Sequence, residues 1–345
     1  MTATLPPGPV LTIGIPTRNR ARFLARAIAS ALLSRSPDVE VLVSDNASTD
    51  DTENVARRFE SDGYPVRYQR HAEDIGFDAN FQSVVRASRG RYLWCLGDDD
   101  KIEDGGVEQA LSLIREHAQI GGITFEANGY SVDGQLVEVC DSSRSVVVFE
   151  GTSAALTHPK FLHRLANLTL HVFRTDLARQ VLASHVLPAN GCSAHHLMLR
   201  ILASDHGWLW TDIPAAGWTY GNDSFMNNGL LARARLALTA YSSNLRSVFG
   251  EDSPAVNVWE RHHLVPLARQ YVLRAKNVSY AVQHCRPYRC GSRERWKIAW
   301  LTGRHLARHL GFWTRVLPTI IAPRTAIELA ASLRRHTRDT LARRA

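Results

Sequence analysis

The chain has 345 residues, 45% of them apolar and 21% charged, enough apolar side chains for one large or two modest cores. No window of 18 uncharged apolar residues occurs, so we expect no membrane-spanning helix. The net charge of +8 is uneven: residues 258–345 carry 18 Lys and Arg against 4 Asp and Glu, a net of +14, and the remainder is mildly acidic.

The cysteines and the first residues indicate a reducing compartment. Five cysteines, at positions 95, 140, 192, 285 and 290, include no C-x-x-C pair. The opening MTATLPPGPV has neither the basic nor the apolar segment of a secretory signal. We therefore expect free thiols and a cytoplasmic location.

Residues 1–130 alternate between strand-like and helix-like patterns. Strands are expected at 10–15, 39–45, 66–70, 91–96 and 120–126, and helices at 21–33, 50–60, 79–88 and 106–117. This alternation predicts an α/β fold with a mainly parallel sheet flanked by helices. Ligands of such sheets bind beyond the carboxyl ends of the strands. Three segments lie there: PTRNR (16–20), SDNASTD (44–50) and GDDDK (97–101).

The pattern changes after residue 130. A hairpin is expected around Asp133-Gly134, strands at 168–173 and 208–213, and a helix over 192–204. From residue 229 the chain is helical and rich in arginine.

Three consecutive aspartates, Asp98, Asp99 and Asp100, directly follow an apolar strand. Carboxylates are the hard oxygen ligands that Mg²⁺ and Mn²⁺ prefer, so this turn is suited to hold a cation beside a diphosphate. A solvated acidic turn is the alternative. Asp45, in SDN, is placed to accept a hydrogen bond from a nucleoside or to cap a turn. Neither G-x-G-x-x-G after the first strand nor G-x-x-x-x-G-K-[ST] occurs, which excludes dinucleotide-binding and P-loop sites.

The segments LTIGIPTRNRARFLARAIASAL, VEVLVSDNASTDDT and EDIGFDANFQSVVRASRGRYLWCLGDDDKI resemble the nucleotide-sugar-binding half of family 2 glycosyltransferases with the GT-A fold. They are most similar to the abequosyltransferase-like, bacterial O-antigen type, over about residues 10–130. The resemblance implies inverting transfer from a nucleoside-diphosphate sugar with Mg²⁺ or Mn²⁺. By position, it implies that Pro16, Arg18 and Asp45 contact the nucleoside, Asn80 lines the donor pocket, Asp98 and Asp99 lie on the ribose and sugar side, and Asp100 with Asp98 binds the metal.

Two positions depart from the pattern of that family. Arg18 replaces an aromatic residue, so a guanidinium plane would stack on the base, and Asp74 replaces the asparagine before IGF. A third departure concerns the catalytic base.

The family often has a Glu-Asp pair at the start of a helix reading L-x-x-R-L. Here LMLRIL (197–202) keeps the helix, but Ser193 and Ala194 fill the acidic positions. His195 and His196 are the nearest titratable groups, and helical phase favours His196 as the base. Two structural histidines, or a base elsewhere such as Asp205, are the alternatives.

These features predict a metal-dependent, hexosyltransferase-like glycosyltransferase. The expected donors are UDP- or dTDP-sugars, and the acceptor is a saccharide, a lipid-linked saccharide or a natural product. Residues 1–130 would bind the nucleotide sugar, 131–228 the acceptor and the base, and 229–345 would form a basic helical region. A nucleotidyltransferase and a non-catalytic nucleotide-sugar-binding protein remain alternatives.

The basic helical region has three interpretations. It mixes Trp and Leu with Arg as interfacial helices do, which favours the anionic inner face of the cytoplasmic membrane. A helical subdomain with a solvated basic face is the second. Nucleic acid is not expected as a partner, since no reader motif accompanies the charge.

Overall fold

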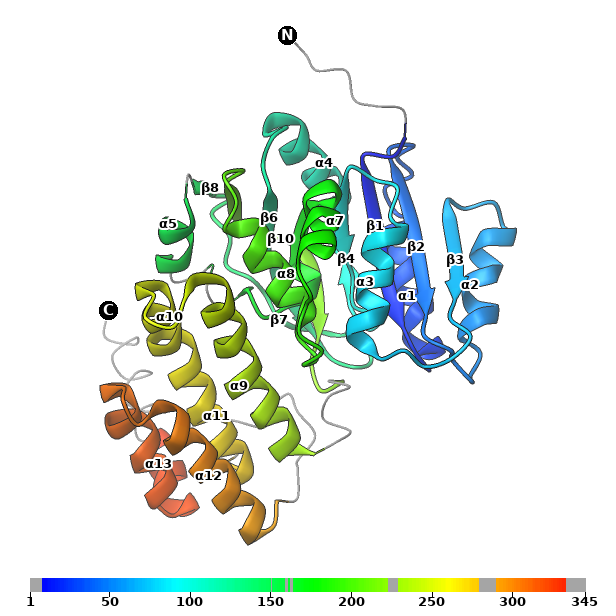
Figure 1. The fold of residues 1–345 in the computed structure, drawn as a ribbon. Coiled ribbons are helices and arrows are strands. Elements are labelled where there is room, and N and C mark those ends of the chain that lie inside the picture. The colour runs from blue at the N-terminus through cyan, green and yellow to red at the C-terminus, as the bar shows by residue number, and fades with distance from the viewer. Residues whose placement is uncertain are drawn as a thin grey trace, which may run out of the picture. The chain divides into compact units, whose positions relative to one another are not determined.

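The computed structural model describes residues 8–149, 151–158, 161, 164–222, 229–278 and 290–332 (Figure 1). The chain divides into two compact units. The first, here the sheet unit, comprises Met1–Tyr220 and Asn244–Glu251, and the second, here the helical unit, comprises Gly221–Ser243 and Asp252–Ala345. The expected boundary at residue 130 is not a boundary of the structure, because later strands complete the same sheet.

One mixed sheet forms the centre of the sheet unit. Its main path has the order β3-β2-β1-β4-β9-β6-β10-β5. Strands β1, β2, β3 and β4 are parallel, and so are β6 and β10, whereas β9 runs antiparallel between β4 and β6. The strands are β1 (Leu11–Thr17), β2 (Val39–Asp45), β3 (Val66–Arg70), β4 (Tyr92–Cys95), β5 (Lys101–Ile102), β6 (Gly122–Tyr130), β7 (Leu136–Glu138), β8 (Val146–Phe149), β9 (His171–Arg174) and β10 (Trp208–Thr219).

Helices cover both faces of this sheet. Helices α3, α7 and α8 pack against one another and lie in front of the sheet in Figure 1, while α1 lies behind it. On α1, Leu24, Ala27, Ile28 and Ala31 are buried at the three- and four-residue spacing of one helical face. The helices are α1 (Ala21–Ala31), α2 (Thr52–Ser61), α3 (Phe77–Ala87), α4 (Gly106–Glu116), α5 (Thr152–Thr157), α7 (Thr175–Ser184) and α8 (Ser193–Leu202).

The central strands are buried along their whole length, which explains their continuous apolar runs. Every residue of β1 and of β4 is buried. Trp94 on β4 stacks on Phe125 of β6 with ring centroids 5.4 Å apart. The core thus extends across the antiparallel insertion of β9.

The sequence-based strands at 39–45 and 66–70 are confirmed, and the other strands and helices of the first 130 residues differ by a few residues at their ends. The strand expected at 168–173 is instead a short 3-10 turn, Leu168–Leu170, followed by β9. Helix α7 and the short strand β5 were not expected. The mainly parallel character of the sheet is confirmed.

The helical unit contains most of α9 (Leu230–Phe249), then α10 (Pro254–Trp259), a π-helical turn at Glu260–Leu264, α11 (Val265–Ala275), α12 (Ser292–Leu306), a second π-helical turn at Phe312–Val316, and α13 (Leu317–Ile321). Glu260 is buried in this unit and accepts hydrogen bonds from Arg308 and His309, at 2.5 and 2.8 Å. Within the described ranges, no helix has the length and apolarity needed to cross a bilayer.

Candidate active site

The loops that follow β1, β2 and β4 meet at one edge of the sheet, because parallel strands end on the same side. Hydrogen bonds join the first two loops. The Asn46 N–H donates to the carbonyl of Thr17 (2.9 Å), and the side-chain oxygen of Asn19 accepts from the Thr49 N–H (2.7 Å). The edge that the sequence singled out is therefore a connected set of loops.

Arg20 holds the first two aspartates of the turn after β4. Its Nε lies 3.4 Å from Oδ1 of Asp98 and its Nη2 lies 3.1 Å from Oδ2 of Asp99. The Thr17 hydroxyl donates to the other oxygen of Asp98 at 2.8 Å. Burial, and then the charge of Asp99, raise the pKa of Asp98 to about 7. One guanidinium thus leaves the carboxylates of this turn only partly neutralised.

Asp100 points toward the protein and anchors the turn. Its Oδ2 accepts from the Thr169 hydroxyl at 2.5 Å, and its Oδ1 accepts from the N–H of Thr219, at the end of β10, at 2.8 Å. A Cβ at Gly97 would lie 2.8 Å from the same carboxylate, so glycine is required there. Burial and the charge of Asp99 raise the pKa of Asp100.

The backbone of Asp99 is fixed from the opposite side. Its carbonyl accepts from the Arg26 guanidinium (2.9 Å) and from the Thr219 hydroxyl (2.5 Å). Arg20, Arg26 and Thr219, none of them singled out from the sequence, therefore determine how the turn presents its carboxylates. Arg20 was detectable, since it stands in the PTRNR segment.

The donor set suits a divalent cation of the magnesium type. Among the residues that the structure describes, no three His, Cys, Asp or Glu side chains converge on one point. Such a cage is not required, because Mg²⁺ commonly uses one or two carboxylates together with substrate phosphates and waters. The excess negative charge at Asp98 and Asp99 fits this arrangement. Asp100 fits it less well, because both of its oxygens already serve Thr169 and Thr219.

Asp45 and Pro16 are buried rather than exposed at the sheet edge. One oxygen of Asp45 accepts from the N–H and hydroxyl of Ser48, and the other accepts from Tyr68 (2.6 Å) and Arg70 (3.3 Å). Pro16 is buried within β1. These contacts stabilise the end of β2, and the nucleoside contact that the resemblance implies for Asp45 and Pro16 stays a prediction.

The two departures near the nucleoside position form one interaction. Nη1 of Arg18 lies 2.5 Å from Oδ2 of Asp74. The other oxygen of Asp74 accepts from the Asn46 amide (2.6 Å) and from the Gly76 N–H (3.0 Å). The hydrogen bonds from Gly76 and Asn46 and the charge of Arg18 lower the pKa of Asp74. Arg18 keeps 46% of its side chain exposed, so its guanidinium plane remains accessible.

Asn80 is hydrogen-bonded to β2, and its expected place in the donor pocket stays a prediction. It is 2% exposed. Its side-chain oxygen accepts from the Ser44 hydroxyl at 2.7 Å and its amide donates to the Ser44 carbonyl at 3.0 Å. Both halves of the amide are thus used by the residue that precedes Asp45.

The structure does not bring the histidines of α8 to the aspartates. His195 and His196 are each 3% exposed. His196 accepts from Nε of Arg200 at 3.3 Å and neighbours Asn244, and burial followed by the charge of Arg200 lowers its pKa to about 4. In the part of the chain that the structure describes, none of its polar contacts is to the 98–100 turn. Asp205 is exposed beyond the opposite end of α8.

A carboxylate from another helix stands at the start of α8. Asp78, in the first turn of α3, accepts the N–H groups of Gly191 (2.7 Å) and Ser193 (3.0 Å). Sequence reasoning missed it because residues 78 and 193 are far apart in the chain. An acidic residue in a first helical turn signals only a local cap. The structure therefore places a carboxylate where the helix itself has Ser193 and Ala194.

Residues 12–138 match the model of the family described as glycosyl transferase family 2. The abequosyltransferase RfbV of Salmonella typhimurium is 25% identical over 210 residues, which cover 60% of this chain and 56% of that protein. A GalNAc(5)-diNAcBac-PP-undecaprenol beta-1,3-glucosyltransferase of Campylobacter jejuni is 31% identical over 116 residues, 33% of this chain and 36% of that protein. The match thus spans about half or less of these curated relatives.

Solved structures share the fold. TarS 1–349 of S. aureus superposes with a TM-score of 0.59 at 13% identity, covering 90% of this chain and 82% of that one. The mannosyltransferase PcManGT of Pyrobaculum calidifontis, solved with GDP-Man and Mn²⁺, gives 0.54 at 16% identity, covering 93% and 87%. These likenesses confirm the expected GT-A fold.

Proposed function

We propose that the chain, whose residues 12–138 match glycosyl transferase family 2, is a glycosyltransferase of the O-antigen type that transfers a sugar, with inversion, from a nucleoside-diphosphate sugar to a hydroxyl group of an acceptor. The observation that carries this proposal is the turn of Asp98 and Asp99 with Arg20 at the carboxyl edge of the sheet. The carboxylates of Asp98 and Asp99, only partly neutralised by Arg20, provide a place for a cation and a diphosphate. The exposed guanidinium of Arg18 provides a surface for the nucleobase.

In this proposal Asp99, with Asp98, holds Mg²⁺ or Mn²⁺. The metal supplies Lewis-acid stabilisation of the negative charge that develops on the leaving diphosphate. Asp100 keeps the turn in place through Thr169 and Thr219. Arg20 orients both ligating carboxylates, and Arg18, steadied by Asp74, stacks on the nucleobase. Asp45 and Asn80 act indirectly, by fixing the end of β2.

We propose Asp78, rather than His196, as the first candidate for the catalytic base. The resemblance expects a carboxylate at the start of the helix that contains LMLRIL, and Asp78 supplies one there. A buried imidazole whose pKa lies near 4 is a weak base, and its partners are Arg200, one turn further along α8, and Asn244 of α9. General-base assistance typically contributes about 10²–10⁴-fold to the rate.

The donor and acceptor follow from the relatives. TarS of S. aureus has been solved with UDP-GlcNAc and with UDP, and the Campylobacter jejuni relative is named for an undecaprenol-linked saccharide. We propose a UDP- or dTDP-hexose as donor and a saccharide, lipid-linked or natural-product hydroxyl as acceptor. Exposed Trp296, Trp300 and Trp313 in the Arg-rich helical unit support contact with the anionic inner face of the membrane.

The test is a titration of purified protein with UDP-, dTDP-, GDP- and CDP-sugars with Mn²⁺ or with chelator. We expect one donor to bind and to be slowly hydrolysed, and Asp99→Asn to abolish both. Binding of free nucleoside triphosphates in preference to every sugar nucleotide would favour a nucleotidyltransferase, and donor binding without any turnover would favour a sensor.

A further inference from the structure

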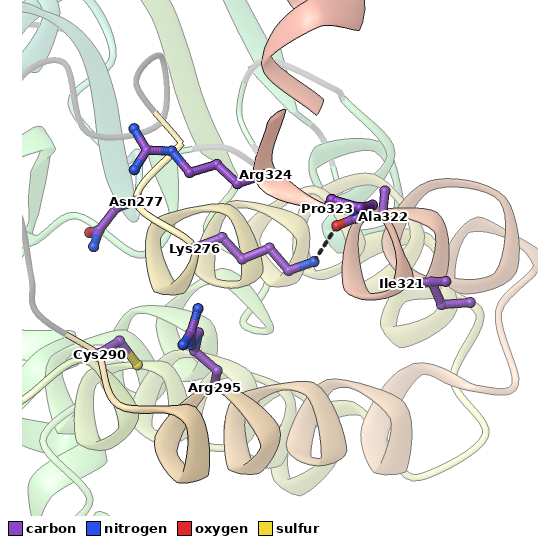
Figure 2. A pocket seen from close by; sticks show the side chains of 8 residues that line it. All are labelled: Lys276, Asn277, Cys290, Arg295, Ile321, Ala322, Pro323 and Arg324. Atoms are coloured by element: carbon purple, nitrogen blue, oxygen red, sulfur yellow. Dashed lines mark hydrogen bonds between the residues drawn. The ribbon is translucent and has the colours of Figure 1, made fainter. Parts of the chain in front are cut away.

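The helical unit contains a pocket of about 500 Å³, separate from the aspartate turn (Figure 2). The end of α11, the start of α12 and the segment after α13 line it. Lys276, Arg295 and Arg324 contribute to its wall together with Asn277, Cys290 and Ile321. All of these residues belong to the helical unit, so the pocket is complete within it.

Positive charge dominates this pocket. Arg324 pairs with Glu328 at 3.0 Å, but no acid is paired with Arg295 or Lys276 among the described residues. The Lys276 ammonium donates to the carbonyls of Ile320 (2.7 Å) and Ala322 (2.6 Å), as Figure 2 shows for Ala322. Burial, and then the charge of Arg295, lower the pKa of Lys276. Because the positive charges of Lys276 and Arg295 repel each other, binding of an anion in the pocket would be favourable.

The remaining polar groups indicate which anion fits. The side-chain oxygen of Asn277 is buried and accepts no hydrogen bond from any described residue, so a ligand hydroxyl would satisfy it. Burial and the neighbouring Glu294 raise the pKa of the Cys290 thiol to about 12, so it stays neutral and is not suited to bind a metal. Ile321, which lines the pocket, is 72% exposed.

We propose that this pocket binds a phosphate diester that carries a neighbouring hydroxyl, the chemistry of a phosphatidylglycerol headgroup. Arg295, Lys276 and Arg324 neutralise the phosphate, and Asn277 accepts the hydroxyl of the glycerol. The exposed Ile321 provides an apolar contact for the first carbons of an acyl chain. The site adds recognition of one headgroup to the general attraction of a basic surface.

The experiment uses the full chain and water-soluble dihexanoyl-phosphatidylglycerol, below the concentration at which it forms micelles, in titration calorimetry. Loss of one charge-assisted contact should weaken binding about tenfold in Arg295→Gln. The matched control is Arg293→Gln, which removes the same charge from the same helix but does not line the pocket. It should bind like the wild type. Both variants should unfold near the wild-type temperature, since neither arginine makes a side-chain hydrogen bond or ion pair with a described residue.

Two further measurements distinguish a lipid headgroup from free phosphate as the ligand of the pocket. Weaker binding of inorganic phosphate than of the lipid supports a headgroup site, whereas equal binding would overturn the headgroup and leave a simple anion site. No binding of either probe, or equal weakening in Arg293→Gln and Arg295→Gln, would overturn the pocket. If the pocket is overturned but the protein still binds phosphatidylglycerol vesicles, the general attraction of the basic surface to the membrane stands. The proposed sugar transfer is tested separately, by donor binding to the sheet unit.

Discussion

Replacing Asp100 with asparagine and with alanine should have very different effects on the stability of the metal-free protein. Asparagine keeps an oxygen for the Thr219 N–H, and its amide can donate to the Thr169 hydroxyl, while it removes a charge that Asp99 repels. We expect a change within about 0.5 kcal/mol. Alanine leaves both donors without an acceptor, and at about 1–3 kcal/mol for each orphaned group we expect a loss of roughly 2–6 kcal/mol.

The assay is thermal unfolding with chelator, followed by donor titration with Mn²⁺. The alanine variant should melt roughly 5–10 °C lower than the wild type, and the asparagine variant close to it. Asn and Ala variants of equal stability would refute the anchoring role of Asp100. If Asp100→Asn also loses metal-dependent donor binding while it folds normally, Asp100 is a ligand after all, as the resemblance implied.

Four further outcomes are expected. Asp99→Asn should weaken Mn²⁺-dependent donor binding at least tenfold in calorimetry with an unchanged melting temperature; unchanged affinity would remove Asp99 from the metal site. A double-mutant cycle of Arg18→Ala and Asp74→Asn should show little coupling in the free energy of unfolding, as for other exposed ion pairs, and a strong coupling would contradict this. Asp78→Asn should lower the transfer rate about 10²-fold or more while His196→Ala lowers it far less, and the reverse order would reinstate the histidine. The pKa of His196 is lowered from 6.5 to about 4, so as the pH falls the unfolded chain takes up this proton before the folded chain does. The free energy of unfolding, measured with urea, should therefore fall between pH 6.5 and 4, and it should fall less in His196→Gln.

The spacing of apolar residues was sufficient to predict the strands and helices that carry the site. The runs at 39–45 and 66–70 are uniformly strand-like and short, so their bounds were predictable, and the alternation with helices placed their ends on one edge. A strand was expected at 168–173, but the later start of β9, at His171, and its antiparallel direction were not predictable. Its apolar residues are shared with the preceding 3-10 turn, and a pattern of burial carries no information on strand direction.

Motif positions located the site but did not define the role of each side chain. A residue that matches a family motif either contacts the ligand or stabilises the loop that does, and the sequence alone does not distinguish these two roles. Asp45 and Asn80 have structural partners, Tyr68 and Ser44, that come from other segments and could not be identified from the motifs. Likewise, Arg18 and Asp74 looked like two separate departures until their side chains were found 2.5 Å apart.

The position of β9 has a consequence for how the chain is made. During synthesis, β4 and β6 emerge early, but their partner in the sheet follows only at His171–Arg174, and β10 is complete only at Thr219. Until then both strands expose unpaired N–H and C=O groups along apolar edges, which favours association with other nascent chains. A ribosome stalled after residue 130 would therefore hold an aggregation-prone fragment. Truncations intended to isolate the nucleotide-sugar half should be soluble only when they extend past β10.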